Sequence, residues 1–283
     1  MCVAGMPYAR RTVRCGHLVA RATEAQVTVL TVLDRPQEAQ QAQAILNHAR
    51  QMLEGLAVET KTRRGLPAEE ILLEVEEGGY DLVVIGAREV LSWAEQLLGS
   101  VARQIVSRTK VPVLVVKGSC SSLDRVLICT GGREYAEPAI EVGTRLAKAT
   151  GARVTILHVI SPPPTMYTGL REMEERVADF LGRDTPEARH LKGAAEVLQR
   201  HDVQGELELR QGVVADEILH KARKGNYDLI VVGSSYGQSG IRRYLLGDVT
   251  RQILDRSTRP VLVVPPPKQM ERLISGAGAI PET

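Results

Sequence analysis

The amino-acid sequence contains the same pattern twice. Residues 80–86 read YDLVVIG and residues 227–233 read YDLIVVG, while residues 99–116 and 247–264 share eleven of eighteen positions. The spacing of 147 or 148 residues between matching positions is far longer than that of a solenoid repeat, so it indicates a duplicated small domain. A chain of 283 residues accommodates two domains of ordinary size. We therefore expect two similar domains that can be compared position by position.

The composition restricts the classes of function. A net charge of +2 gives little attraction for nucleic acid, and one Trp and one Phe leave few aromatic rings for stacking on bases. No apolar run reaches the roughly 20 residues that a membrane-spanning helix needs. The N-terminus also lacks the basic-then-apolar pattern of a signal peptide. We expect a cytoplasmic protein with neither nucleic acid nor membrane as a partner.

The cysteines and histidines show no metal-ligand or redox motif. Cys2, Cys15, Cys120 and Cys129 contain no Cys-x-x-Cys spacing, and the six histidines contain no zinc-binding spacing. We expect buried free thiols in a reduced protein, with a redox pair as the alternative. His158 lies in an apolar strand, which favours a structural role.

The second copy alternates strands with helices, which predicts βαβ units and a parallel sheet. Its expected strands are Val126–Cys129, Val154–Ile160, Glu206–Arg210, Leu229–Val232 and Val261–Val264. Its expected helices are Pro138–Ala149, Pro186–Arg200 with Thr185 as N-cap, Ala215–Lys224 and Asp248–Asp255. The matching strands of the first copy are Val27–Leu33, Val58–Thr62, Leu82–Ile85 and Val113–Val116. Runs such as VLVV are apolar throughout, which suits strands buried on both faces.

The duplication also predicts the domain boundaries. We expect domains over residues 1–117 and 124–266, a linker over 118–123 and a flexible tail over 267–283. The first copy begins inside its first strand, so either the natural start lies upstream or this edge of the domain is shortened. The second copy carries extra residues near 161–181, which we interpret as a solvated helical insertion or, alternatively, as a lid or partner-binding loop.

A glycine-rich loop follows the fourth strand of each copy. In an open parallel sheet, ligands bind beyond the carboxyl ends of the strands, where the strand order reverses. Glycine lets the backbone approach a phosphate, and a helix N-terminus offers free N–H groups. The loop positions of interest are Gly86, Gly99 and Ser100 in the first copy, and Gly233, Gly237, Gly240, Gly247 and Asp248 in the second. A phosphate site is one interpretation of these loops; a simple turn and helix cap is the other.

These loops resemble those of the universal stress proteins, whose mark is G-x2-G-x9-G-[S/T] followed by a helix and a Pro-Val-Leu-Val-Val strand. The resemblance covers nearly the whole chain, twice, including the turns at Gly65 and Gly212. It implies an α/β fold with two doubly wound five-stranded parallel sheets of order 3-2-1-4-5. It also implies that the last strands of the two domains pair, which makes the tandem chain a pseudo-dimer. Many members of this family bind ATP in this loop, and others do not.

Both copies depart from the family pattern. Glu89 replaces the second glycine in the first copy, and Asp248 replaces the hydroxyl residue in the second. Ala4 and Gly131 stand where the family has an adenine-binding Asp. An acid beside a phosphate opposes binding, because two unit charges about 4 Å apart repel by ~4 kcal/mol at an effective dielectric constant of about 20. Nearby arginines, or a Mg²⁺ ion bridging Asp248 to a phosphate, would offset this repulsion.

The sequence therefore supports two functions. The first is a regulatory module that binds an adenine nucleotide, ATP or AMP, in at least one domain. The second is a nucleotide-free interaction protein with an unidentified protein partner, and either form could also make a homodimer. Slow ATP hydrolysis ranks last, because the chain has no G-x4-G-K-[S/T] loop and no evident general base. The candidate nucleotide-binding residues are Gly86, Arg88, Gly99, Ser100, Gly131, Gly233, Gly237, Gly240, Gly247 and Asp248; we assign no catalytic or metal-binding residue.

Overall fold

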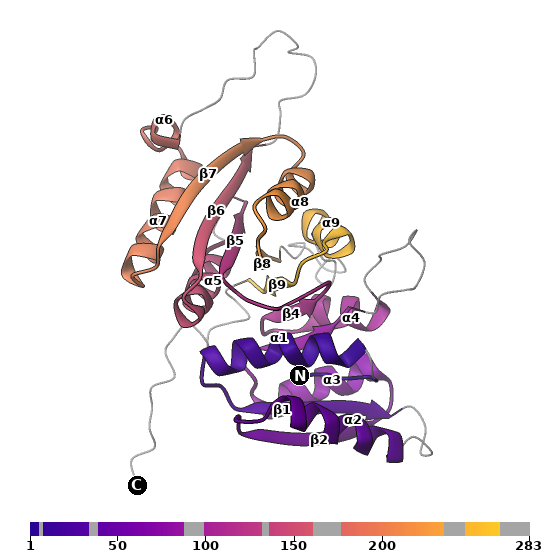
Figure 1. Cartoon of the computed structure of the whole chain (residues 1–283). Coiled ribbons are helices and arrows are strands. Elements are labelled where there is room, and N and C mark those ends of the chain that lie inside the picture. The colour runs from indigo at the N-terminus through magenta and orange to yellow at the C-terminus, as the bar shows by residue number, and fades with distance from the viewer. Residues whose placement is uncertain are drawn as a thin grey trace.

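The computed structural model describes residues 1–5, 8–33, 39–87, 99–131, 136–160, 177–234 and 247–266. Helices and strands alternate through both copies (Figure 1). The first copy contains α1 (Tyr8–Ala22), β1 (Val27–Leu33), α2 (Ala39–Met52), β2 (Val58–Arg64), α3 (Pro67–Gly78), β3 (Val83–Gly86), α4 (Ser100–Arg108) and β4 (Val113–Val116). The second contains β5 (Arg125–Thr130), α5 (Glu137–Thr150), β6 (Arg153–Ile160), α6 (Val177–Leu181), α7 (Pro186–Arg200), β7 (Gly205–Gln211), α8 (Val214–Lys224), β8 (Leu229–Gly233), α9 (Asp248–Arg256) and β9 (Val261–Val264).

Local chemistry sets the ends of several helices. The Thr185 hydroxyl accepts a hydrogen bond from the Ala188 N–H at 3.2 Å, and Pro186 takes the first position of α7, as the sequence predicts. After α5, Gly151 has a φ of 70°, a left-handed conformation that glycine adopts without steric cost. These caps set where the helices begin and end, and the apolar faces of the helices cover the sheet.

The second copy is a complete parallel sheet. Its strands run in the order β7-β6-β5-β8-β9, and every neighbouring pair is parallel. Counted within the copy, this order reads third, second, first, fourth and fifth. The order therefore reverses between β5 and β8, whose carboxyl ends lie side by side.

We expect a five-stranded sheet in the first copy, but its first strand is shorter than this arrangement requires. Its first strand is reduced to an isolated bridge at Cys2, which joins Leu30 of β1 on one side and Ile85 of β3 on the other. Backbone hydrogen bonds from Cys2 to Val84 and from Leu30 to Met1 hold this segment between the two strands.

The two copies share one seven-stranded sheet through an antiparallel pair between β4 and β9 (Figure 1). Val113 pairs with Val263, Leu114 with Leu262, and Val115 with Val261, so the register is symmetric about Leu114 and Leu262. All residues of both strands are buried. The expected pairing of the last strands is confirmed, and it covers two apolar edges that would otherwise meet water.

Two hydrophobic cores lie on opposite faces of this shared sheet. Leu114 and Leu262 belong to the core beneath α5 and α7, whereas Val113 and Val263 belong to the core beneath α8 and α9. This alternation follows from the period of two along a strand. Each of these two cores contains side chains from both copies, whereas a third core, beneath α1 and α2, contains side chains of the first copy alone.

Polar contacts with the last turn of α9 reinforce the seam, among them the pair of Arg103 with Asp255 at 3.3 Å. The Lys117 ammonium, which is 7% exposed, donates to the backbone carbonyls of Leu254 and Asp255 at 2.7 and 2.9 Å. These carbonyls belong to the last turn of α9, where the helix dipole favours a cation. The position equivalent to Lys117 in the second copy is Pro265, which has no such donor.

The cysteines differ from the expectation of four free thiols. Cys15 in α1 and Cys120 after β4 form a disulfide, with their Cα atoms 5.3 Å apart. Their separation of 105 residues hides the pairing in the sequence, and the packing of α1 on β4 brings the two together. Cys2 and Cys129 remain free thiols.

Other expectations concern the insertion, the tail and the membrane. Residues 161–176 and 267–283 lie outside the described part of the chain. The insertion ends in α6, where Phe180 is buried, so this end packs into the core rather than being solvated. Within the described ranges, no helix has the length and apolar character required to cross a bilayer.

Candidate functional site

The predicted loop positions lie at the carboxyl ends of the strands. Gly86 ends β3, and Gly233 ends β8. Gly131 follows β5, which is parallel to β8 in a register that pairs Cys129 with Val232. Gly131 and Gly233 are therefore at the same edge of the sheet, beside the point where the strand order reverses.

In each copy, one helix begins near the carboxyl ends of that copy's strands. Gly99 is the N-cap of α4 and Gly247 is the N-cap of α9, with nearly identical φ values of −56° and ψ values of 149° and 145°. Neither helix has a side-chain hydrogen bond at its cap. The N–H groups of each first turn thus receive no acceptor from an N-cap side chain and offer the positive end of a helix dipole, which is a suitable arrangement for an anion.

In the second copy, hydroxyl groups attach the helix start to the strand ends. Thr250, in the first turn of α9, donates to the Gly233 carbonyl at 3.1 Å. The Ser234 N–H and hydroxyl both donate to the Val264 carbonyl, at 2.8 and 3.3 Å. Both side chains are buried, so these contacts fix the position of α9 against β8 and β9. Ala102 and Ala87 occupy the equivalent positions of the first copy, which lacks the two hydroxyls.

The acid at the second helix start has a cationic partner. The Asp248 carboxylate pairs with Arg251 one turn later at 3.1 Å, and its side chain is 83% exposed. Solvent and Arg251 both reduce the repulsion that we expect between Asp248 and a phosphate. Sequence reasoning omitted Arg251, although the i, i+3 spacing on a helix is a signal that could have found it.

A polar cluster of the second copy lies beside Gly131 and was also missed from the sequence. The Thr130 hydroxyl and His190 Nε2 are 2.6 Å apart, and His158 Nδ1 lies 3.0 Å from the Thr130 carbonyl, to which it donates. Burial lowers the pKa of His190; Glu137 raises it and His158 lowers it further. His190 is therefore neutral at neutral pH. His158 has the structural role that its apolar strand predicts.

The structure keeps the candidate residues of the two copies apart. Because β4 and β9 are antiparallel, the carboxyl ends of β3 and β8 point in opposite directions. Gly86, Gly99 and Ser100 thus belong to one edge, and the second-copy residues belong to the other. The candidates Arg88, Gly237 and Gly240, together with the acid Glu89, lie outside the described residues.

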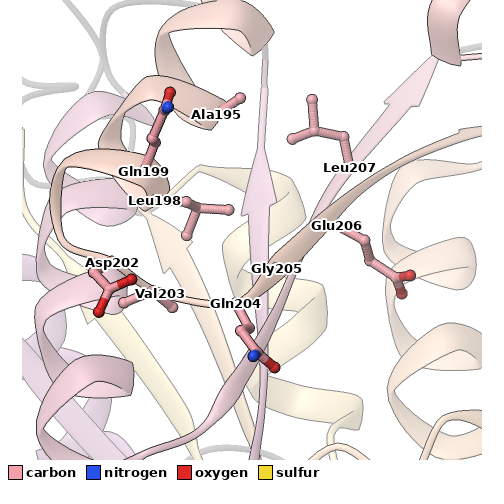
Figure 2. Close-up of a pocket in the computed structure, with 9 residues that line it drawn as sticks. All are labelled: Ala195, Leu198, Gln199, Asp202, Val203, Gln204, Gly205, Glu206 and Leu207. Carbon is pink, nitrogen blue, oxygen red and sulfur yellow. The ribbon is translucent and has the colours of Figure 1, made fainter.

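Two surface hollows in the described residues lie elsewhere. One, of about 410 Å³, is found between the end of α7 and the start of β7, with Leu198 and Leu207 at its walls (Figure 2). The other, of about 550 Å³, occupies the equivalent place between α2 and β2 of the first copy. Both are at the amino ends of the strands, opposite the helix starts. They are features of the shared fold and do not belong to the candidate nucleotide sites.

Metal ligands do not gather at either helix start. Within the described ranges, no group of three or more His, Cys, Asp or Glu side chains is placed to hold a metal ion. Asp248 is the acid in the first turn of α9, and Arg251 already pairs with it. An ion at that position would compete with Arg251 for the carboxylate.

Comparisons with known proteins agree on one family. The model of the universal stress protein family matches residues 1–117 and 122–265. A universal stress protein of Methanocaldococcus jannaschii is 28% identical over 155 residues, which are 55% of this chain and 89% of the relative. Another, from Mycolicibacterium smegmatis, is 27% identical over 234 residues, or 80% of this chain and 75% of the relative. The crystal structure of a universal stress protein from Archaeoglobus fulgidus superposes with a TM-score of 0.72 at 22% identity, covering 94% of this chain and 97% of the other.

Proposed function

The chain belongs to the universal stress protein family, and we propose that it is a regulatory protein that binds an adenine nucleotide, ATP or AMP. The phosphates would contact the backbone N–H groups at the start of α4 or α9. The observation that supports this proposal is the pair of glycine N-caps, Gly99 and Gly247, which begin their helices without a side-chain cap. No catalytic residue is part of the proposal.

The two copies offer different advantages to a nucleotide. The first turn of α4 contains no acid and begins with Ser100, whose hydroxyl is a further phosphate donor. The second copy has the complete strand β5 and a helix start fixed by Thr250, but it also carries Asp248. We propose that the nucleotide contacts involve Gly86, Gly99 and Ser100 in the first copy, and Gly131, Gly233, Gly247 and Asp248 in the second.

Substitution at the two N-caps tests the proposal. Gly99→Val and Gly247→Val place a branched side chain where a phosphate would approach the backbone. At a φ of −56° a non-glycine residue fits the backbone, so both variants should fold. Calorimetric titration with Mg·ATP and with AMP should show at least tenfold weaker binding in the variant of the occupied copy. Gly193→Ala, in α7 and with open space around its added carbon, is the matched control.

If the wild type binds nucleotide and both valine variants bind it equally well, the nucleotide site is elsewhere. Asp248→Ser adds a second measurement. If Asp248 opposes phosphate, its removal should tighten binding several-fold; weaker binding in this variant would instead indicate that Asp248 holds a magnesium ion. The two outcomes have opposite signs, so one titration separates them.

A nucleotide-free interaction protein is the second candidate. Ala4 and Gly131 favour it, because neither can supply the acid that the family uses after its first strand. Mass spectrometry of small molecules released from the purified protein, combined with titration, distinguishes the two functions. Absence of any nucleotide and of any ATP or AMP binding would support the interaction protein.

A further inference from the structure

The Cys15–Cys120 bridge joins two segments that have different roles in the fold. Cys15 lies in the middle of α1 and is fully buried, whereas Cys120 lies in the segment between the copies and is 6% exposed. The Cα separation of 5.3 Å is normal for a disulfide. Both residues are part of the core that extends across the shared sheet, together with Leu114 and Leu123.

This bridge is not a property of the repeated fold. The helix equivalent to α1 in the second copy is α5, where Val142 and Gly143 correspond to Cys15 and Gly16. Among the described residues, α5 has no covalent bond to another element. The same helix packing therefore forms without a disulfide, so the bridge adds something specific to the first copy.

On one side, the bridge holds α1 against the end of β3. Thr12 is one turn before Cys15, and a Cβ placed on Gly86 would lie only 2.5 Å from the Thr12 hydroxyl oxygen. This close approach means that α1 packs directly on the strand end that leads into the first candidate loop. A movement of α1 would therefore change the surroundings of Gly86.

On the other side, the bridge holds the segment that joins the copies. Three residues before Cys120, Lys117 binds the last turn of α9 through two carbonyls. Gly118 has a φ of 58°, and a Cβ at this position would lie 2.1 Å from the Thr258 carbonyl oxygen. The disulfide thus ties α1 to a segment that is itself in contact with the second copy.

We propose that Cys15 and Cys120 are a reversible oxidation site, and that their disulfide fixes α1 against β3 and against the junction of the two copies. The oxidant is a hydroperoxide, for which hydrogen peroxide is the probe. The Cys120 thiolate attacks the peroxide, becomes a sulfenic acid and releases hydroxide. The Cys15 thiolate then attacks the Cys120 sulfur, and the sulfenic oxygen leaves as a second hydroxide. A dithiol reverses the bond by exchange and is itself oxidised to a disulfide.

The order of these steps follows from burial. Cys120 retains some exposure and receives the peroxide, while Cys15 is enclosed and acts as the resolving thiol. The two remaining cysteines are poor competitors. A sulfenic acid formed on Cys2 or Cys129 would have no resolving thiol and could not proceed to an intramolecular disulfide. Neither has a partner cysteine within the described residues.

Thiol counting and hydrogen exchange on the wild type test the proposal without a substitution. Denatured protein should show four thiols after dithiothreitol and two after one equivalent of hydrogen peroxide, with the Cys15–Cys120 peptide found by mass spectrometry. Reduction should speed amide exchange at least tenfold in α1 and leave α5, its unbridged counterpart, unchanged. Cys15→Ser and Cys120→Ser should each make α1 exchange independent of redox state; Cys129→Ser should respond as the wild type does.

Three results would overturn the proposal. The first is that four thiols persist after peroxide treatment. The second is that dithiothreitol does not open the bridge in the native protein, which would make it a permanent crosslink. The third is equal exchange of α1 in the oxidised and reduced wild type. Because these readouts use the unsubstituted protein and no nucleotide, they are independent of the proposed nucleotide binding.

Discussion

An ion pair couples the outer strand of each copy to the following helix, and its charges are exchanged between the copies. In the first copy, Lys61 of β2 binds Glu74 of α3 at 2.9 Å. At the positions 147 residues later, Glu208 of β7 pairs with Lys221 of α8. An arginine also sits two residues after the strand partner in both copies. The contact has been kept while both charges were reversed, which indicates that the pair matters more than either residue.

Reversing one charge should destabilise the fold, and reversing both should restore it. Glu208→Lys would place three cations together with Lys221 and Arg210, so we expect a loss of roughly 1–3 kcal/mol, between the values of exposed and buried pairs. Adding Lys221→Glu recreates the arrangement of the first copy and should recover most of this loss. Urea unfolding measures both; Lys148→Glu, in an exposed pair with Asp202, should change little.

Glu74 makes the stability of the first copy depend on pH. Burial would raise the pKa of its carboxyl, but hydrogen bonds from Lys61, Tyr80 and Arg63 outweigh burial and hold the pKa at about 2. A lowered pKa in the folded state stabilises the protein fully above about pH 4.5, and this contribution is lost as the pH falls from 4.5 toward 2. At one pKa unit per 1.4 kcal/mol, it amounts to at most about 3 kcal/mol.

Glu74→Gln tests this directly. The variant should be less stable than the wild type at pH 7, and the difference should shrink as the pH falls below 4.5, because the carboxyl is then protonated in the unfolded state before it is protonated in the folded state. Chemical unfolding at pH 7, 4 and 3 would show the convergence. A difference that stays constant across this range would show that the carboxylate charge is not what stabilises the contact.

At the scale of elements, sequence patterns predict those features that depend on near neighbours. The helix Pro186–Arg200 was predictable because Thr185 and Pro186 mark its start, and β4 and β9 because each is a short, wholly apolar run. The starts of α4 and α9 were also predictable from a local signal, because Gly99 and Gly247 directly precede these helices. Contacts between distant segments were not: Thr130 with His190 and Cys15 with Cys120 meet only through packing.

The segment that joins the copies is an element with strict steric limits. We expect Gly118→Ala to cost roughly 2–4 kcal/mol, because it combines a left-handed backbone with a Cβ that would overlap the Thr258 carbonyl. Gly79→Ala is a matched control, since Gly79 has a φ of 62° but open space around the added carbon. Thermal unfolding of the two variants separates backbone strain from the clash; equal losses would mean that the contact with Thr258 is unimportant.

At the scale of the whole molecule, Lys117 is a buried polar tie between the copies. Lys117→Met keeps the length of the side chain and removes the donor to two carbonyls of α9, so we expect a loss of about 1–3 kcal/mol. Lys110→Met serves as the control, because Lys110 is well exposed and its pair with Glu76 spans 3.9 Å. A stability equal to that of the wild type in both variants would show that the Lys117 contact does not stabilise the seam.

Because side chains of both copies fill the two cores on either face of the shared sheet, the chain should unfold in one cooperative step. The seam is intramolecular, so the midpoint of thermal unfolding should not depend on protein concentration, unlike that of a dimer of separate chains. Calorimetry over a hundredfold range of concentration checks this. Two resolved transitions would mean that the copies are independently stable, and a midpoint that rises with concentration would mean that chains also associate.

The tether between the copies changes how this seam can evolve. In a dimer of identical chains, every substitution at the two-fold interface appears twice, so a change must suit both sides at once. Here the positions on either side of the axis are separate codons, and Lys117 opposite Pro265 shows that they have already diverged. One half of the protein is therefore free to acquire a new activity while the other half preserves the joint fold.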